Sequence, residues 1–162
     1  KVGMPADFCR EISFSAQLHD IGKMSVNSAI LTKRGRLDED ERFEMNQHTS
    51  YGNQILARSD RLNMAAEIAL SHHEQWDGGG YPEGLKGEQI PISARILEIA
   101  DIYDALRSER AYKPAFSHEK TFQILTVGDD RLDPKKHFEP KLLQVFEENH
   151  EEFNQIRKRL ED

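Results

Sequence analysis

Apolar residues recur every three or four positions along most of the chain, which is the spacing of amphipathic helices. The first stretch of this kind begins near Phe8 and reaches about Ile21. It predicts a helix that carries His19 and Asp20 near its C-terminal end. A loop with a short helical piece is expected next, around residues 27–31. The beginning of the chain is therefore expected to be helical.

Two further helices are expected before the middle of the chain. Residues 38–41 have the spacing of a capping box, which marks the start of a helix. Apolar positions between 43 and 56 lie on one face of that helix, which would present His48. The next apolar stripe begins near Asp60 and ends at His72, where a polar, glycine-rich loop starts. Each of the two helices therefore carries a histidine.

The C-terminal half returns to the helical pattern after a long loop over residues 74–91. Apolar positions 92–103 form one helix face, and Asp101 lies at its rim. Residues 117–128 predict a helix with a serine cap at its start and a glycine at its end, and Pro140 begins the last helix. No alternating pattern is long enough to predict a β-strand. The sequence therefore predicts a single all-α bundle of about five to seven helices.

Composition narrows the class of protein further. A chain of 162 residues suits one domain, which at this length buries about 70% of the surface of the unfolded chain. Its 22 Lys and Arg residues face 29 Asp and Glu, and the net charge of −7 comes without a basic block. This argues against a nucleic-acid partner and against contact with an anionic membrane. No apolar stretch approaches the ~18–20 residues that span a bilayer.

The single cysteine, Cys9, excludes an internal disulfide and a cysteine-rich zinc module. Such sparse cysteine usage fits a reducing compartment, so the cytoplasm is the expected location. Cys9 itself is expected to be a small core residue.

Histidines cluster in three short runs, at residues 19–23, 47–52 and 72–74, and each run is expected on a different helix or at its end. Neutral imidazole and carboxylate are ligands for borderline divalent metals, and a carboxylate can bridge two ions about 3.5–4 Å apart. Asp20 is the natural bridge, because side chains from facing helices of a bundle can complete such a site. The predicted metal ligands are His19, Asp20, His48, His72, His73 and Asp101.

Each predicted ligand also has a simpler interpretation when it is taken alone. The His-Asp pair is typical of a contact at a helix end, and His48 of a satisfied core histidine. Asp101 could pair with a basic residue such as Arg95. The ordered set of ligand types within residues 19–101 favours the metal site over these separate explanations. The other histidines lack ligand-type partners at useful spacing and are expected at the surface or in caps: His118, His137 and His150.

From about Ala16 to Phe146 the sequence resembles the HD-GYP family, a branch of the HD-domain metal-dependent phosphohydrolases. The segment Leu18-His-Asp-Ile-Gly-Lys23 carries the resemblance with moderate specificity. The highly specific segments are His72-His-Glu74, Asp77-Gly-Gly-Gly-Tyr-Pro82, Ala100-Asp-Ile-Tyr-Asp-Ala-Leu106 and Arg110-Ala-Tyr-Lys113. The resemblance implies an all-helical HD core with a long glycine-rich loop. It also implies hydrolysis of cyclic di-GMP, a bacterial second messenger, to the linear dinucleotide or GMP.

The resemblance further implies roles for single residues. The six predicted ligands stand at the family's metal positions, where two or three divalent ions bind, usually iron or manganese. Lys23, Arg110 and Lys113 stand where the family contacts substrate phosphate. Asp20 and Lys23 are the expected catalytic residues, and Tyr81 is expected to contact the substrate at the site entrance.

The loop Gly80-Tyr81-Pro82 names the family and is associated with partner docking. The partners that the resemblance implies are cyclic di-GMP and a diguanylate cyclase domain, and a homodimer is a further expectation. Two other functions stay open at this point. One is a catalytically silent receptor or interaction module, and the other is an HD-type phosphohydrolase that acts on different nucleotides.

One departure from the family concerns the start of the chain. Family members carry a further ligand histidine upstream of the His-Asp motif, and no histidine precedes His19 here. The first residue is Lys1 rather than Met. Residues 1–162 are therefore expected to be an HD-GYP domain that lacks its first core helix and any upstream sensory or receiver domain.

Overall fold

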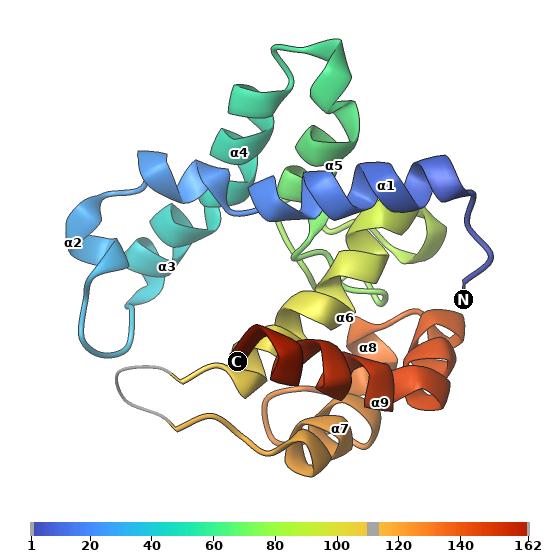
Figure 1. The fold of residues 1–162 in the computed structure, drawn as a ribbon. Coiled ribbons are helices and arrows are strands. Elements are labelled where there is room, and N and C mark those ends of the chain that lie inside the picture. The colour runs from blue at the N-terminus through green and yellow to red at the C-terminus, as the bar shows by residue number, and fades with distance from the viewer. Residues whose placement is uncertain (1, 110–113, 162) are drawn as a thin grey trace.

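The chain folds as the all-α bundle that the sequence predicts (Figure 1). The computed structural model describes residues 2–109 and 114–161, and this part of the chain contains no strand. Its α-helices are α1 (Ala6–Ser15), α2 (Ser28–Leu31), α3 (Glu39–Asn46), α4 (His48–Leu56), α5 (Asn63–Ser71), α6 (Ile92–Arg107), α7 (His118–Thr126), α8 (Pro134–His137) and α9 (Pro140–Glu161). Helices α2 and α8 are single turns, and α8 was not predicted.

Helix α6 lies between two groups of helices (Figure 1). On one side α5 packs against α6, α4 and α1. The smaller apolar core lies here and includes Leu56, Ala65 and Ala69. On the other side α7 and α9 pack against α6 and against each other, around a larger core that includes Ile99 and Phe138. The bundle therefore has two apolar cores, and α6 contributes to the larger one.

The first helix is shorter than predicted. Helix α1 ends at Ser15, and 3₁₀ turns at Ala16–Leu18 and Ile21–Ser25 replace its expected last turns. The cause lies at Gly22, where a Cβ atom would lie 1.8 Å from the carbonyl oxygen of His48. A regular helix cannot bring its axis that close to α4, whereas a tight turn with a glycine can. His19 and Asp20 consequently lie in the bend between the two 3₁₀ segments.

The single helix predicted around His48 is two helices, α3 and α4, which meet at Gln47. Two side chains of α4 bond to the last carbonyl groups of α3. His48 Nδ1 lies 2.8 Å from the oxygen of Met45, and Thr49 donates to the oxygen of Asn46 at 3.0 Å. These side chains take acceptors that a continuous helix would use, which breaks the helix. The predicted capping box at the start of α3 is confirmed.

Two smaller observations complete the fold. Cys9 lies exposed on α1, so its assignment to the core was wrong. The helix that carries it presents Ser15 alone as a buried residue and otherwise lies over the surface of the bundle. None of the described helices combines the length and the apolar character that crossing a bilayer requires.

Candidate metal centre

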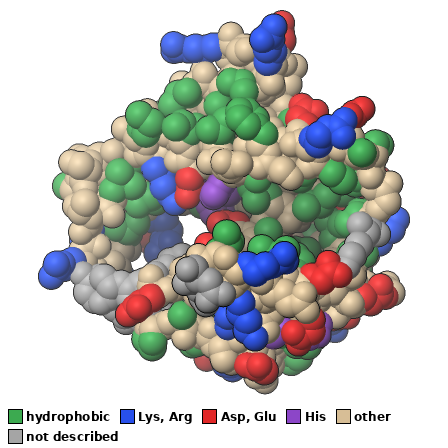
Figure 2. All heavy atoms as spheres, in the orientation of Figure 1, with side chains coloured by type: hydrophobic (Ala, Val, Ile, Leu, Met, Phe, Trp, Pro, Cys, Tyr) green, Lys and Arg blue, Asp and Glu red, His purple; other side chains and the backbone are tan. Residues whose placement is uncertain are grey.

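The six predicted metal ligands converge on one site beside α6. His48 begins α4, and His72 and His73 directly follow α5. His19 and Asp20 come from the bend after α1, and Asp101 comes from α6. In the space-filling view a histidine lies in a hollow at the centre of the face, with acidic and basic side chains beside it (Figure 2). The structure therefore brings together residues that are far apart in sequence.

Three histidines are held in one orientation by the backbone. The Nδ1 atom of His19 lies 2.7 Å from the oxygen of Ala16, and that of His72 lies 3.0 Å from the oxygen of Ile68. His48 makes the equivalent contact with Met45. A hydrogen bond from Nδ1 leaves the lone pair on Nε2, which is the usual arrangement of metal-binding histidines. All three Nε2 atoms lie within 3.9 Å of a carboxylate oxygen of Asp20.

Asp20 lies between the histidines, and one of its carboxylate oxygens has no hydrogen-bond partner among the described residues. Its Oδ2 atom faces Lys23 at 2.5 Å and His19 at 3.4 Å. Its Oδ1 atom lies 3.5 Å from His48 Nε2 and 3.9 Å from His72 Nε2, is buried, and has no hydrogen-bond partner among the described residues. A buried carboxylate oxygen without a donor fits a cation site, because a bound ion would supply the missing partner.

The ligand atoms form two groups that share His72. His48, His72 and His73 make up one group, and His19, Asp20 and His72 make up the other, with the atoms of each group within 4.8 Å of one another. Asp101 Oδ1 lies 3.6 Å from His19 Nε2, next to the second group. Imidazole nitrogens and carboxylate oxygens together suit iron, manganese or zinc. The residues present therefore fit a centre of divalent metal ions.

The pKa values of His72 and His73 agree with such a centre, whereas His19 holds a proton that a metal ion at its Nε2 atom would have to replace. Burial lowers the pKa of His72 to about 4 and that of His73 to about 3, so both are neutral ligands at neutral pH. Burial alone would lower the pKa of His19, but hydrogen bonds to Asp101 and Asp20 raise it to about 10. The pKa of Asp20 lies below its usual range, because contacts with His19 and Lys23 outweigh its burial. Positive charge is thus stabilised between Asp20 and Asp101.

The glycine-rich loop forms a wall of the site. Tyr81 stacks on His73 with ring centroids 4.8 Å apart, and its backbone N–H donates to the oxygen of His73 at 3.1 Å. A Cβ at Gly80 would lie 2.4 Å from that same oxygen, so only glycine fits there. The buried Glu74 holds the loop in place, because its carboxylate accepts hydrogen bonds from the N–H groups of Glu83 and Leu85.

A cavity of about 380 Å³ opens beside the ligands His73 and Asp101. Residues from the C-terminal half of α6 line its apolar side, and Arg131 lies on its rim. Sequence reasoning missed both Arg131 and the anchoring role of Glu74. The only available signal for Glu74 was a carboxylate directly before a glycine-rich loop. No sequence signal pointed to Arg131, since it comes from the segment between α7 and α8.

The other predicted site residues differ in what can be said of them. Lys23 lies at the centre, paired with Asp20, and its contact with substrate phosphate stays a prediction. Arg110 and Lys113, which the resemblance places on substrate phosphate, lie outside the described residues. His137 lies at the end of α8, with Nδ1 on the oxygen of Asp133, as expected of a histidine in a helix end. The surface assignment of His118 was wrong: this residue is buried and bonded to Tyr103.

Comparisons with known proteins agree with the fold and the site. The sequence profile described as HD domain matches residues 1–135. A cyclic di-GMP phosphodiesterase of Vibrio cholerae is 43% identical over 155 residues, which are 91% of this chain and 30% of that protein. A 3′3′-cGAMP-specific phosphodiesterase of the same organism is 44% identical over 153 residues, which are 93% of this chain and 28% of that protein.

A solved structure shares the fold. The crystal structure of a cyclic GMP-AMP-specific phosphodiesterase of V. cholerae matches with a TM-score of 0.65 at 21% identity, over 92% of this chain and 40% of that one. With its profile match, its relatives and its bundle, the chain belongs to the HD domain family, and within it to the HD-GYP type. It spans less than a third of the length of the two curated relatives.

Proposed function

We propose that this domain is a metal-dependent phosphodiesterase that hydrolyses cyclic di-GMP to the linear dinucleotide or GMP. The observation that carries the proposal is the unpartnered, buried Oδ1 atom of Asp20, which faces the Nε2 atoms of His48 and His72 within a cluster of six potential ligand residues. The relatives of this chain include cyclic di-GMP and cGAMP phosphodiesterases, which supports the same reaction class.

The six residues His19, Asp20, His48, His72, His73 and Asp101 would hold two divalent ions, or three, of iron or manganese. Such ions polarise a phosphoryl oxygen and lower the pKa of water, so that a nucleophile exists near neutral pH. The side chains contribute the orientation of the ligands, through the backbone contacts of the three Nδ1 atoms. Lys23, next to Asp20, would neutralise charge on the reacting phosphate.

The cavity beside His73 and Asp101 is the proposed place for the rest of the dinucleotide. Arg131 at its rim would contact a phosphate or a guanine edge, since its planar guanidinium offers paired donors. Tyr81 would border the substrate from the loop side, where it stacks on His73. Arg110 and Lys113 are proposed as further phosphate contacts. These cations explain how a chain of net charge −7 accepts an anionic substrate.

Partner contacts and location are also proposals. Pro82 and Glu83 lie exposed at the tip of the loop, which supports a diguanylate cyclase domain docking there. A homodimer and a cytoplasmic location are proposed from the family resemblance and the sparse cysteine usage.

The test is metal content and turnover of the protein purified without oxygen or chelators. Cyclic di-GMP and 3′3′-cGAMP are offered to the wild type and to the variants His72→Ala and Asp20→Ala, with His137→Ala as a matched control outside the centre. We expect both site variants to lose metal and at least a hundredfold in turnover, and the control to keep both. Unchanged turnover in the site variants would refute the proposal. Binding of cyclic di-GMP without cleavage by metal-loaded wild type would favour the receptor function instead.

A further inference from the structure

A second group of metal-ligating side chains lies in the C-terminal half, apart from the centre described above. His118 begins α7, and His150 and Glu151 lie near the middle of α9. Their ligand atoms lie within 4.8 Å of one another. His118 Nε2 is 2.8 Å from His150 Nδ1 and 3.7 Å from Glu151 Oε1. The distance between His150 Nδ1 and Glu151 Oε1 is 3.8 Å.

His118 is fixed from behind by α6. Its Nδ1 atom lies 2.9 Å from the hydroxyl of Tyr103, and both side chains are buried. When Nδ1 donates to the tyrosine oxygen, the lone pair of His118 is on Nε2, which faces α9. A second partner on the far ring nitrogen is what orients the histidine ligands of known metal sites. Burial lowers the pKa of His118, so the neutral ligand form prevails at neutral pH.

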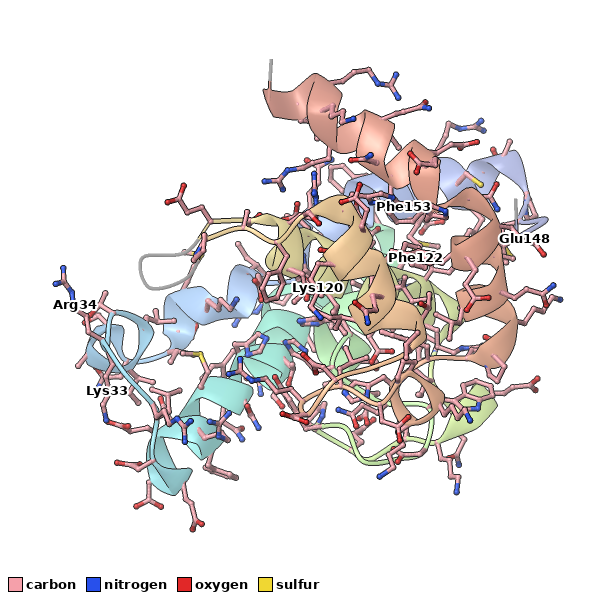
Figure 3. All side chains as sticks on the ribbon, turned by 90° about the horizontal axis from the view of Figure 1, so that it is seen from below. Lys33, Arg34, Lys120, Phe122, Glu148 and Phe153 are labelled. Atoms are coloured by element: carbon pink, nitrogen blue, oxygen red, sulfur yellow. The ribbon has the colours of Figure 1, made fainter. Side chains whose placement is uncertain are left out.

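His150 is held by aromatic packing. Its ring stacks on that of His118 at a centroid distance of 5.1 Å. The centroids of the His150 ring and the Phe122 ring of α7 lie 4.3 Å apart. Figure 3 labels Phe122 on α7 and Phe153 on α9 on this side of the molecule, where both helices pack together. Both phenylalanines pack against the larger apolar core. The two imidazoles are therefore held in place by the surrounding core before any ion binds.

Two imidazole nitrogens 2.8 Å apart need a proton or a cation between them, because facing lone pairs repel. A shared proton meets this need, and so does a metal ion with a small outward shift of His150. The carboxylate of Glu151 adds negative charge at the same point, and its 64% exposed side chain leaves the site open to solvent. We propose that His118, His150 and Glu151 bind a divalent transition metal ion that links α7 to α9.

The ligand chemistry selects the class of ion. Two imidazoles and one carboxylate form the donor set that zinc accepts, with water in the remaining position on the open side. Magnesium and calcium prefer all-oxygen ligands, so the two imidazoles favour a transition metal over either of them. The ion joins residues 118 and 150, which lie on different helices, and it binds only the folded chain. Its binding therefore raises the free energy of unfolding.

The experiment uses Zn²⁺ as the probe. The protein is prepared with metal ions already bound at the first candidate centre, which we call the HD centre. Wild type, His150→Gln and Glu151→Gln are equilibrated with Zn²⁺ and desalted, and metal per chain is counted by elemental analysis. Tm is measured with and without added Zn²⁺. His137→Gln is the matched control, because His137 lies on α8 with its Nδ1 bonded to a backbone carbonyl and belongs to neither group. Exchange at the HD centre changes every variant alike, so differences between variants report this site.

We expect wild type and His137→Gln to hold one Zn²⁺ more per chain than His150→Gln. Their Tm should rise by roughly 5 °C or more at a hundredfold excess of Zn²⁺ over its Kd, and this rise should disappear in His150→Gln. Equal metal content and equal Tm response in wild type and His150→Gln would overturn the proposal, because the two nitrogens would then share only a proton. If His150→Gln does not fold, Glu151→Gln decides: its exposed side chain does not risk the fold, and unchanged Zn²⁺ affinity overturns the proposal.

Discussion

The Oδ1 atom of Asp20 shows at the scale of one residue what the centre is built to hold. It is buried, it faces the Nε2 atoms of His48 and His72, and it accepts no hydrogen bond from the described residues. Leaving a buried acceptor unsatisfied costs about 1–3 kcal/mol. Around it the Nδ1 atoms of His19, His48 and His72 each lie within hydrogen-bond distance of a backbone oxygen. A cation at this point would recover the cost, which is why the arrangement fits a metal better than a structural contact.

Arg131 is the residue on which substrate affinity is expected to depend. It lines the same cavity as His73 and Asp101, and its backbone N–H donates to Asp129 rather than to a residue of the centre. Replacing it by Gln should raise KM for cyclic di-GMP by roughly tenfold to a hundredfold, since a contact with a charged group is worth about 1.5–3 kcal/mol, and leave kcat within about twofold. Steady-state kinetics of Arg131→Gln, with Arg61→Gln as an exposed control outside the cavity, measure this. A fall in kcat at constant KM would contradict it.

The residues that meet at the candidate metal centre, with Lys23 and Tyr81, could be predicted from sequence, whereas Arg131 and the buried position of His118 could not, for a physical reason. His19, Asp20 and their partners are chemically unusual in apolar helices, so their order along the chain carries information before folding. Arg131 and His118 lie in polar stretches where their types are common. What gives each a role is a partner on another element, the cavity beside α6 for Arg131 and Tyr103 for His118. Such partners are created only by tertiary packing.

At the scale of elements, the close approach of the 3₁₀ turn Ile21–Ser25 to α4 positions the HD motif. The predicted Cβ of an alanine at position 22 would lie 1.8 Å from the oxygen of His48 and 2.4 Å from the nitrogen of Gly52. Both are backbone atoms, so the turn itself must move. Gly22→Ala should therefore lower Tm by about 5 °C or more, because overpacking of this kind costs about 1–3 kcal/mol or more, and it should reduce bound metal.

Gly52→Ala provides the graded comparison for that prediction. Its Cβ would lie 3.1 Å from the Cβ of Ala69, a contact that a small shift relieves. We expect its loss in Tm to be less than half that of Gly22→Ala. Thermal unfolding and metal content of both variants test the pair. Equal losses would mean that the distance to His48 does not decide the outcome.

The glycine-rich loop depends on the carboxylate of Glu74. Its two oxygens accept the N–H groups of Glu83 and Leu85 at 2.8 and 2.9 Å. In Glu74→Gln one oxygen becomes an NH₂ group that faces an N–H, which costs about 1–3 kcal/mol locally. Amide hydrogen exchange at Glu83 and Leu85 should therefore accelerate about tenfold or more. Glu88→Gln, an exposed change in the same loop, should leave both rates unchanged, and equal rates in the two variants would count against this role of Glu74.

Elements were predictable from sequence as far as their ends depend on local bonds. The caps at Asp38 and Ser117 are local, and both helices begin where the sequence places them. The ends that differ depend on distant atoms. Helix α1 stops at Ser15 because Gly22 must meet α4, and the helix around His48 divides because side chains take the carbonyl groups before Gln47. The spacing of apolar residues along the sequence carries no information about such contacts.

At the scale of the whole molecule, α6 connects the two candidate metal sites. Its Asp101 faces His19 in the HD centre, and Tyr103, two residues later, bonds to His118 on the other side. The same helix contributes to the larger apolar core. A shift of α6 along its axis would therefore move a residue of each site together. The stability of the whole fold is therefore expected to depend on the ionisable side chains that α6 buries.

The buried side chain of Glu98 on α6 makes stability depend on pH. It is buried on α6 one turn before Asp101, and burial, with the nearby Asp101, raises its pKa well above the ordinary value of 4.5. Above pH 4.5 the unfolded chain releases this proton while the folded protein keeps it, so the folded state binds more protons. The free energy of unfolding must then fall as pH rises, by at most about 1.4 kcal/mol per pH unit from this group.

Glu98→Gln removes this dependence while preserving the shape of the side chain. Other groups also titrate in this range, so the difference between wild type and variant isolates the contribution of Glu98. Denaturant unfolding between pH 5 and 8 at fixed metal content should show the variant losing less stability than wild type as pH rises. The exposed Glu147→Gln on α9 should follow wild type. Parallel curves for Glu98→Gln and wild type would mean that Glu98 ionises freely in the folded protein, and that α6 carries no buried proton between its two sites.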